Sequence, residues 1–155
     1  MSVIRLGAPL EADRNALLDI WVLAWQNVLP QIDFASRRDW FDQYLRVLET
    51  DGAITLLALP DAGNLPAGFI NYHPITGYID QIAITPALQG AGLGKTLLEA
   101  AKNACPSGLT LKVNQQNPRA VRFYEREGFV ISGEGISPAS GLKLWEMVWR
   151  GAKMP

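Results

Sequence analysis

The sequence predicts a single α/β domain of the α+β type, with the element order β-α-α-β-β-β-α-β-α-β-β over residues 1–155. Three observations lead to this prediction. Two helical patterns follow one another near the N-terminus, a hairpin of apolar strands comes next, and a later strand enters a third helix through a glycine-rich turn. A chain of 155 residues is long enough for one sizeable core and too short for two comfortable domains.

The first half of the chain supplies three strands and two helices. Residues 12–28 and 35–49 each place apolar side chains at helical spacing, and Pro30 ends the first of these helices. The segment Pro60–Asn64 is rich in turn-forming residues, so the apolar strands on either side of it are expected to form a hairpin. The strands of this half are expected at residues 2–6, 54–59 and 68–73.

The second half alternates strands with helices before two closing strands. Residues 93–104 place Leu and Ala side chains on one helical face, and Pro118 begins another helix with the same spacing. Asn117 is a favourable N-cap for that helix, and Gly128 followed by Phe129 is typical of a left-handed C-cap with an apolar contact. The strands of this half are expected at residues 78–85, 109–113, 129–133 and 143–150.

The last of these strands carries apolar side chains on both faces. Trp145, Met147 and Trp149 alternate with Leu144, Glu146 and Val148. A strand with one face in water usually shows one polar face. A partner subunit in a symmetric homodimer would cover the second face, as would a helix or loop of the same chain.

Composition excludes several classes of function. The formal net charge is −1, which gives no sign of a nucleic-acid or anionic membrane partner. The single Cys105 excludes an internal disulfide, and one histidine, His73, cannot form a metal cluster by itself, so no metal is expected. The sequence has no N-terminal apolar leader and no run of about 18 apolar residues, so we expect a cytoplasmic protein without a membrane partner.

A glycine-rich loop follows the strand at residues 78–85. It consists of Gln89, Gly90, Ala91, Gly92, Leu93, Gly94 and Lys95. Alternate glycines let backbone N–H groups turn toward one point, where the next helix adds its partial positive charge, so the loop is expected to hold a phosphate or pyrophosphate. A P-loop would need glycine at position 89, and a dinucleotide fingerprint would need glycine at position 95. A plain turn without a ligand remains an alternative, at a cost in conformational entropy for each glycine.

A second motif lies downstream and reads N-x-x-A-x-x-F-Y-E-x-x-G-F from Asn117 to Phe129. Together with Q-x-x-G-x-G in the loop, it resembles the two cofactor blocks of the GNAT superfamily of N-acetyltransferases. The resemblance covers residues 78–129 specifically and the rest of the chain only in pattern. It implies a mixed, mostly antiparallel sheet of about seven strands flanked by four helices, in which the fourth and fifth strands run parallel and splay apart.

The resemblance also implies a cosubstrate, acetyl-CoA, and the residues that bind it. The backbone of Ile82, Ala83 and Ile84 would pair with the pantetheine arm, as an added strand does. The loop from Gln89 to Lys95 would hold the pyrophosphate, and Asn117 would contact the cofactor. Tyr124 would lie beside the sulfur, although a lone tyrosine at helical spacing is also a common core residue.

The chemistry implied is direct attack of an amine on the acetyl carbonyl in a ternary complex. A backbone N–H near residues 82–84 would stabilise the developing oxyanion, and Tyr124 would donate to the leaving sulfur. Candidate bases are Asp80, expected on the same strand face as Ile82 and Ile84, and His73; Tyr78 or an ordered water are further candidates. Relatives that acetylate protein N-termini carry a glutamate where this chain has Lys112, which argues against that mechanism and substrate.

The sequence does not identify the acceptor amine. The two N-terminal helices would cover the acceptor pocket, with Trp21, Trp25, Trp40 and His73 as candidate contacts. A small amine, an amino acid, an aminoglycoside or a peptide amine all fit. A non-catalytic acyl-CoA sensor on the same fold is the alternative function, against which the presence of Tyr124 and Asn117 argues.

Overall fold

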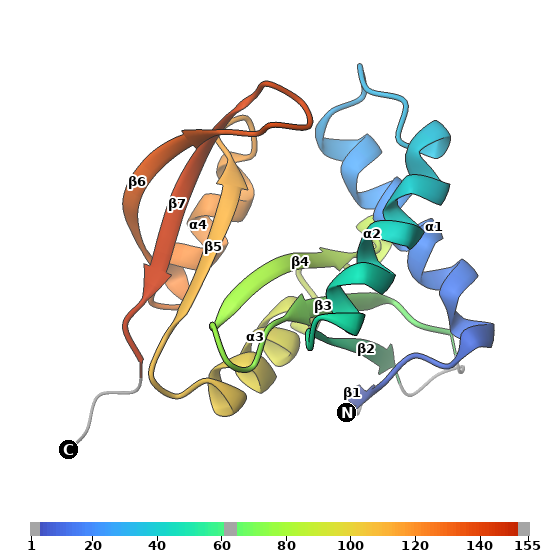
Figure 1. Cartoon of the computed structure of the whole chain (residues 1–155), viewed down its shortest axis with the longest axis horizontal. Coiled ribbons are helices and arrows are strands. Elements are labelled where there is room, and N and C mark those ends of the chain that lie inside the picture. The colour runs from blue at the N-terminus through green and yellow to red at the C-terminus, as the bar shows by residue number, and fades with distance from the viewer. Residues whose placement is uncertain (1–3, 61–64, 152–155) are drawn as a thin grey trace.

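A seven-stranded sheet with the strand order β1-β2-β3-β4-β5-β7-β6 lies between two layers of helices in the computed structural model, which describes residues 4–60 and 65–151 (Figure 1). The strands are β1 (Ile4–Gly7), β2 (Ile54–Pro60), β3 (Gly68–Tyr72), β4 (Tyr78–Ile84), β5 (Leu109–Asn114), β6 (Val130–Ile136) and β7 (Lys143–Trp149). The helices are α1 (Arg14–Val28), α2 (Arg38–Thr50), α3 (Leu93–Ala104) and α4 (Pro118–Arg126). The predicted fold class and element order are confirmed.

Most predicted element bounds hold to within two or three residues, and the largest differences occur at two helix starts and at the end of β6, which continues to Ile136 instead of residue 133. The helix expected from residue 12 begins at Arg14, after a 3₁₀ turn (η1, Glu11–Asp13) in which Asp13 accepts a hydrogen bond from the Leu10 N–H at 2.8 Å. The helix expected from residue 35 likewise begins with a 3₁₀ turn (η2, Ala35–Arg37). Residues 1–3 of the opening strand and 61–64 of the hairpin turn lie outside the described residues.

The sheet opens between β4 and β5. Strand β4 remains antiparallel to β3 as far as Ile84, and β5 remains antiparallel to β7 as far as Asn114. The parallel pairing between β4 and β5 covers only Tyr78 with Thr110 and Ile79 with Leu111. The two strands therefore diverge toward their C-terminal ends (Figure 1), which confirms the splayed pair that the family resemblance implied.

A β-bulge interrupts β4 just beyond the point where β5 departs. Gln81 pairs with Asn71, but the next pair along β3 joins Tyr72 to Ile79. Asp80 is therefore the extra residue, with no partner of its own on β3. A bulge of this kind twists the strand and changes the face to which its side chains point.

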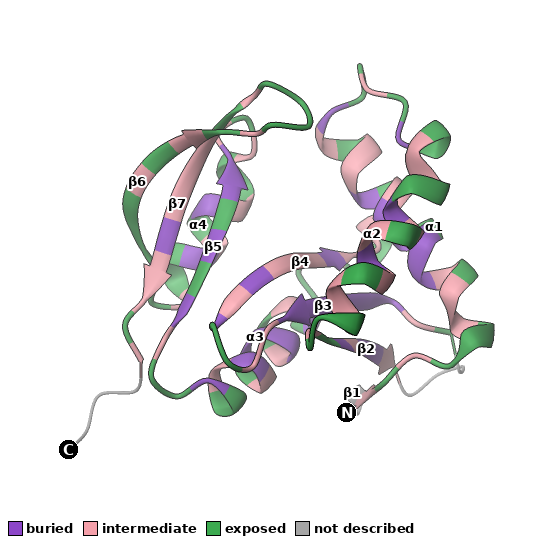
Figure 2. Cartoon of the chain, viewed as in Figure 1, coloured by how far each residue is buried: buried purple, intermediate pink, exposed green. Residues whose placement is uncertain are grey.

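Two apolar cores form, one on each face of the sheet. Helices α1 and α2 cover one face, where Phe41 of α2 packs with Leu57, Phe69 and Ala83 of the strands. Helices α3 and α4 cover the other face, and Figure 2 shows buried segments on both layers. The side chains of β7 that reach this second core are Trp145, Met147 and Trp149. No helix among the described residues is both long and apolar enough to cross a membrane.

Candidate functional site

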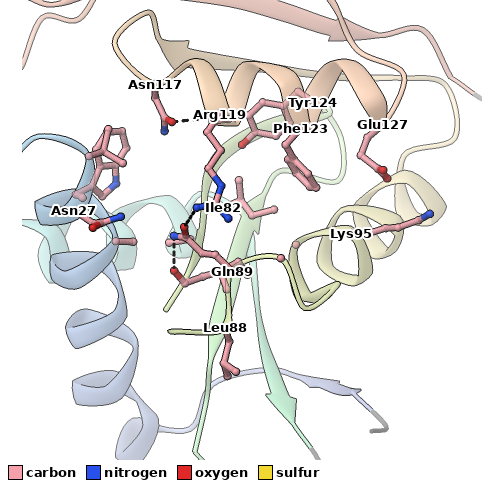
Figure 3. A pocket seen from close by; sticks show the side chains of 18 of the residues that line it. Asn27, Ile82, Leu88, Gln89, Lys95, Asn117, Arg119, Phe123, Tyr124 and Glu127 are labelled. Carbon is pink, nitrogen blue, oxygen red and sulfur yellow. Dashed lines mark hydrogen bonds between the residues drawn. The ribbon is translucent and has the colours of Figure 1, made fainter. Parts of the chain in front are cut away.

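A cavity of about 560 Å³ lies where the sheet opens, bounded by α1, β4, the glycine-rich loop and α4 (Figure 3). Its walls therefore come from four segments that are far apart in the sequence. Its volume is within the range of small-molecule sites. The predicted cofactor residues that line it are Ile82, Ala83, Ile84, Gln89, Gly90, Gly92, Gly94, Lys95, Asn117 and Tyr124.

The glycine-rich loop has the backbone geometry of an anion site. Gly90 and Gly92 have φ values of +89° and +87°, which only glycine adopts readily, and a Cβ at either would meet no atom within 4 Å. The first backbone hydrogen bond of α3 runs from the Thr96 N–H to the Gly92 carbonyl at 3.1 Å. The N–H groups of Leu93, Gly94 and Lys95 therefore have no acceptor within the helix, and they lie at its positive end.

Gly94 has a different role from its neighbours. Its φ is not in the left-handed region, but a Cβ there would lie 3.3 Å from the ring of Phe123 on α4. This glycine lets α3 and α4 approach one another beside the cavity. Ala91 and Leu93 do not line the cavity, and the Leu93 side chain is buried in the core, so these two predicted residues can contribute only backbone groups.

Gln89 connects three elements instead of simply facing a ligand. Its side-chain nitrogen donates to the Ile84 carbonyl at 3.3 Å, and its side-chain oxygen accepts from the Arg119 guanidinium at 3.0 Å (Figure 3). The contact joins β4, the loop and α4 across the cavity. Sequence analysis missed Arg119, because nothing in its local pattern indicates a partner 30 residues away.

Backbone groups on the free edge of β4 face the cavity without a partner strand, and among them the Ile84 carbonyl accepts from the Gln89 side chain at 3.3 Å. The Thr85 N–H donates to the Ala67 carbonyl at 2.8 Å, and hydrogen-bonded pairs alternate along an antiparallel ladder. The backbone groups of Ile82 and Ile84 therefore point away from β3, toward the position that β5 has left. Ala83 also lines the cavity, but the same alternation directs its backbone toward Phe69 of β3, so the predicted set of three backbone partners narrows to two.

Helix α4 places Tyr124 on the opposite wall. The Asn117 side chain accepts a hydrogen bond from the Ala120 N–H at 3.2 Å, as predicted for an N-cap. At the other end, Gly128 has a φ of +97° and the Phe129 N–H donates to the Tyr124 carbonyl at 2.9 Å. Phe129 also contacts the Tyr124 ring, with ring centroids 5.7 Å apart. Both ends of this short helix therefore fix the position of Tyr124.

Tyr124 is 7% exposed, and its hydroxyl is directed toward the cavity (Figure 3). Burial raises the pKa of this hydroxyl above the ordinary tyrosine value. The side chain is therefore a neutral hydrogen-bond donor at physiological pH. Tyr124 belongs to the core cluster and also lines the cavity, so its ring packs in the core while its hydroxyl remains available to a ligand.

Asp80 lies on the other face of β4, and the prediction that it shares a face with Ile82 and Ile84 is wrong. Ile82 and Ile84 pack against the core under α3, whereas Asp80 accepts a hydrogen bond from the Tyr44 hydroxyl of α2 at 2.6 Å. The bulge at Asp80 is the physical reason, since it breaks the two-residue alternation of the strand. The Gln81 side chain donates to the second carboxylate oxygen at 3.1 Å, so Asp80 is held from two sides.

His73 is not part of the cavity. Its Nδ1 accepts from the N–H groups of Ile75 and Thr76 at 3.2 and 3.4 Å, and its Nε2 lies 3.1 Å from the Asp51 carbonyl. The ring therefore organises the β3–β4 turn, which is at the end of β4 opposite the glycine-rich loop. His73 thus lies away from the cavity beside which it was expected as a base and acceptor contact, and its ring is held by the turn instead. Burial raises the pKa of Tyr78 to about 12, which leaves little phenolate to act as a base near neutral pH.

Of the three tryptophans predicted as acceptor contacts, Trp25 alone lines the cavity. Trp21 is 4% exposed and stacks on Phe41 with ring centroids 4.2 Å apart, so it belongs to the core. Trp40 is 53% exposed and stacks on Tyr44 on the outer side of α2. The helical periodicity placed these rings on α1 and α2 but could not tell which of them lies beside the opening of the sheet.

The charges around the cavity favour a polyanionic ligand. Lys95, Arg119 and Arg126 line it together with one carboxylate, Glu127. With the free N–H groups at the start of α3, these cations match the phosphates of a nucleotide-type ligand. In the described part of the chain, no three His, Cys, Asp or Glu side chains gather to hold a metal ion.

Comparison with known proteins gives a consistent result. A model of the acetyltransferase (GNAT) family matches residues 14–129. The peptidyl-lysine N-acetyltransferase YjaB of Salmonella typhimurium is 44% identical over 69 residues, which cover 44% of this chain and 45% of YjaB. The mycothiol acetyltransferase of Paenarthrobacter aurescens is 32% identical over 111 residues, which cover 68% of this chain and 34% of that protein. The matched segment thus spans less than half the length of these curated relatives.

Solved structures share the whole fold. The apo form of YjaB from Escherichia coli superimposes with a TM-score of 0.74 and 25% identity, covering 98% of this chain and 99% of that chain. The paia N-acetyltransferase of Thermoplasma acidophilum, solved in complex with coenzyme A, gives a TM-score of 0.77 at 19% identity, covering 96% and 99% of the two chains. The seven-stranded sheet and its four helices are therefore an established architecture.

Proposed function

The chain belongs to the acetyltransferase (GNAT) family, and we propose that it transfers the acetyl group of acetyl-CoA to a primary amine by direct attack in a ternary complex. One observation carries the proposal. The unpaired edge of β4, the anion-binding start of α3 and the Tyr124 hydroxyl all face one cavity at the opening of the sheet. A polyphosphate with an extended amide-containing arm and a reactive sulfur at its end fits that combination of groups.

The residues present fit acetyl-CoA. The N–H groups at the start of α3 would hold its pyrophosphate, and Lys95, Arg119 and Arg126 would balance its remaining charge. The N–H and carbonyl of Ile82 and the N–H of Ile84 would pair with its amides, since the Ile84 carbonyl already accepts from Gln89. When bound, this cosubstrate supplies an activated acetyl group as a thioester.

Three groups of the chain would act on the reacting atoms: the Ile82 N–H, the Tyr124 hydroxyl and the Asp80 carboxylate. The Ile82 N–H, left free by β5, would donate to the carbonyl oxygen as negative charge develops on it. The Tyr124 hydroxyl would donate to the sulfur as it leaves. Because a free tyrosine titrates near ~10 and a thiol near ~8.5, and burial raises the pKa of Tyr124 further, a strengthening hydrogen bond fits better than complete proton transfer.

Asp80 would take the proton that the amine releases. The carboxylate lies on the α2 face of β4, and a ligand in the cavity lies at the free edge of the same strand, so amine and acetyl group would meet across that edge. An amine becomes a much stronger acid once its nitrogen bonds to the acetyl carbon, so the carboxylate can accept its proton at that stage. Tyr44 and Gln81 would hold Asp80 in position for this step.

The acceptor we propose to test first is a peptidyl lysine. The relative YjaB, in both Salmonella typhimurium and Escherichia coli, is a peptidyl-lysine N-acetyltransferase. A lysine side chain ends in a primary amine, as the proposed chemistry requires. Small diamines, amino acids and aminoglycosides form the comparison set of the experiment.

The test is release of free thiol from acetyl-CoA in the presence of each amine. Tyr124→Phe keeps the ring and its packing, so we expect turnover to fall by roughly ten- to a thousandfold with little change in the Michaelis constant for acetyl-CoA. Tyr72→Phe is the matched control, because Tyr72 is equally buried in the same core but does not line the cavity. Tight acetyl-CoA binding without transfer to any amine would favour an acyl-CoA sensor instead.

We further propose a cytoplasmic location and a symmetric homodimer. The dimer is supported by half-exposed Leu144 and Val148 on β7 and by 48% exposed Val130 on the neighbouring β6. Sedimentation at micromolar concentration would show a dimer, and a monomer there would contradict this part of the proposal.

A further inference from the structure

The cavity has two chemically different ends. Figure 3 shows Lys95 of α3 and Asn27 of α1 on opposite sides of Ile82. The α3 end has free N–H groups and cationic side chains. The α1 end is formed largely by the side chains of Ala24, Trp25 and Val28, which are apolar. A ligand that spans the cavity therefore places phosphate at one end and an apolar group at the other.

The apolar end is the end that the acyl group would reach. A pyrophosphate at the start of α3 fixes one part of the ligand, and the free backbone of Ile82 and Ile84 leads its arm along β4. The direction from α3 past Ile82 leads toward α1 (Figure 3). The last portion of an acyl-CoA would therefore meet the wall that contains Ala24 and Trp25.

Trp25 is a rigid part of that wall. Its ring stacks on Phe34 with centroids 5.9 Å apart, and Phe34 in turn contacts Trp21 edge-on at 5.5 Å. Trp21 is stacked on Phe41 in the buried core. Because a chain of aromatic contacts fixes the indole from behind, the ring cannot turn aside to admit a larger ligand without disturbing that core.

We propose that Trp25 limits the length of the acyl chain that the cavity accepts, so that an acetyl group fits and a longer acyl group is excluded. The inference rests on the proposed function for the identity of the ligand. Discrimination between acyl groups is assigned to the indole because it is the largest side chain that α1 contributes to this end of the cavity, whereas Ala24 beside it contributes only a methyl group. A rigid wall can discriminate by tenfold or more for each added methylene, as enzymes do between homologous substrates.

Calorimetric binding of CoA, acetyl-CoA and butyryl-CoA to the whole chain tests this inference without an acceptor. The wild type should bind butyryl-CoA at least ~10-fold more weakly than acetyl-CoA, and Trp25→Ala should reduce that ratio to about threefold or less. Affinity for CoA itself should change little. Leu23→Ala, on the exposed side of the same helix, is the control and should discriminate as the wild type does.

Each outcome is decisive. Equal affinity of the wild type for the two acyl-CoAs, or undiminished discrimination in Trp25→Ala, would overturn the inference. If Trp25→Ala does not fold, Trp25→Phe provides the second variant. Its ratio of acetyl-CoA to butyryl-CoA affinity should lie between that of the wild type and that expected for Trp25→Ala. The two proposals can also fail separately. If the wild type discriminates between acetyl-CoA and butyryl-CoA and the variant does not, the role of Trp25 is upheld, even where no acetyl transfer to any amine is found and the proposed reaction fails. Binding of none of the three would contradict both.

Discussion

The glycine-rich loop lies on one side of β4, and the Asp80 carboxylate lies on the other. The contacts that position them differ greatly in sequence separation. The loop takes its shape from its own residues, since Gly90 and Gly92 supply the positive φ angles and α3 begins directly after them. Asp80 is positioned by a bulge against β3 and by Tyr44, which lies 36 residues earlier. The glycine-rich loop is thus encoded locally, and the surroundings of Asp80 are assembled by the tertiary fold.

Substitution of Asp80 should distinguish the two sides of β4 most clearly, because we expect it to change turnover and not the affinity for acetyl-CoA. Asp80→Asn is nearly isosteric but cannot take up a proton, so we expect turnover to fall by about a hundredfold. Affinity for acetyl-CoA should stay within about twofold, because Asp80 does not line the cavity. Steady-state kinetics with a verified amine, combined with calorimetry, measures both quantities. Asp39→Asn, an exposed carboxylate on α2, should change neither.

Removal of the Tyr44 hydroxyl extends this test to the neighbouring helix. Tyr44→Phe leaves Asp80 with Gln81 as its hydrogen-bond donor, so turnover should fall by about tenfold, the effect of one lost hydrogen bond to a charged group. Wild-type turnover in both Asp80→Asn and Tyr44→Phe would show that this side of β4 has no part in proton removal.

Gly92→Ala should damage the cofactor side alone. Alanine at a φ of +87° is strained by about 1–2 kcal/mol, and relief of that strain would turn the free N–H groups away from their common point. We expect acetyl-CoA affinity measured by calorimetry to fall by well over ~10-fold in a folded protein. Gly141→Ala is the matched control, because Gly141 also has a positive φ and open space around it but lies in the β6–β7 turn and does not line the cavity. Unchanged affinity in Gly92→Ala would contradict the anion site.

The smallest effect is expected at the N-cap of α4. Asn117→Ala removes the acceptor of the Ala120 N–H, which should lower the free energy of unfolding by about 1 kcal/mol. Urea denaturation measures this change. Asn103→Ala, an exposed site within α3, should cause no such loss. Equal stability of Asn117→Ala and the wild type would mean that water replaces the cap without cost.

Local patterns also explain which elements could be predicted. The helical spacing of residues 35–49 and the Pro118 start of α4 reflect preferences that act within a few residues, and a helix forms in each segment, α2 from Arg38 and α4 from Pro118. The same holds for Gly128, whose positive φ follows from its place after a helix. Helix starts were less accurate, because the 3₁₀ turns before α1 and α2 depend on local hydrogen bonds such as that of Asp13.

The sequence is enough to predict the order of the elements, the glycine-rich loop, the capped helix that carries Tyr124 and, through the two motifs, the family. These features depend on backbone preferences and on side chains that are neighbours along the chain. The tertiary structure alone decided that Asp80 faces α2, that His73 organises a distant turn, that Arg119 binds Gln89, and that Trp25 instead of Trp21 or Trp40 reaches the cavity. Each of these outcomes depends on the register of strands or the packing of helices whose residues are far apart in the sequence, and a one-residue bulge is enough to reverse the face of a side chain.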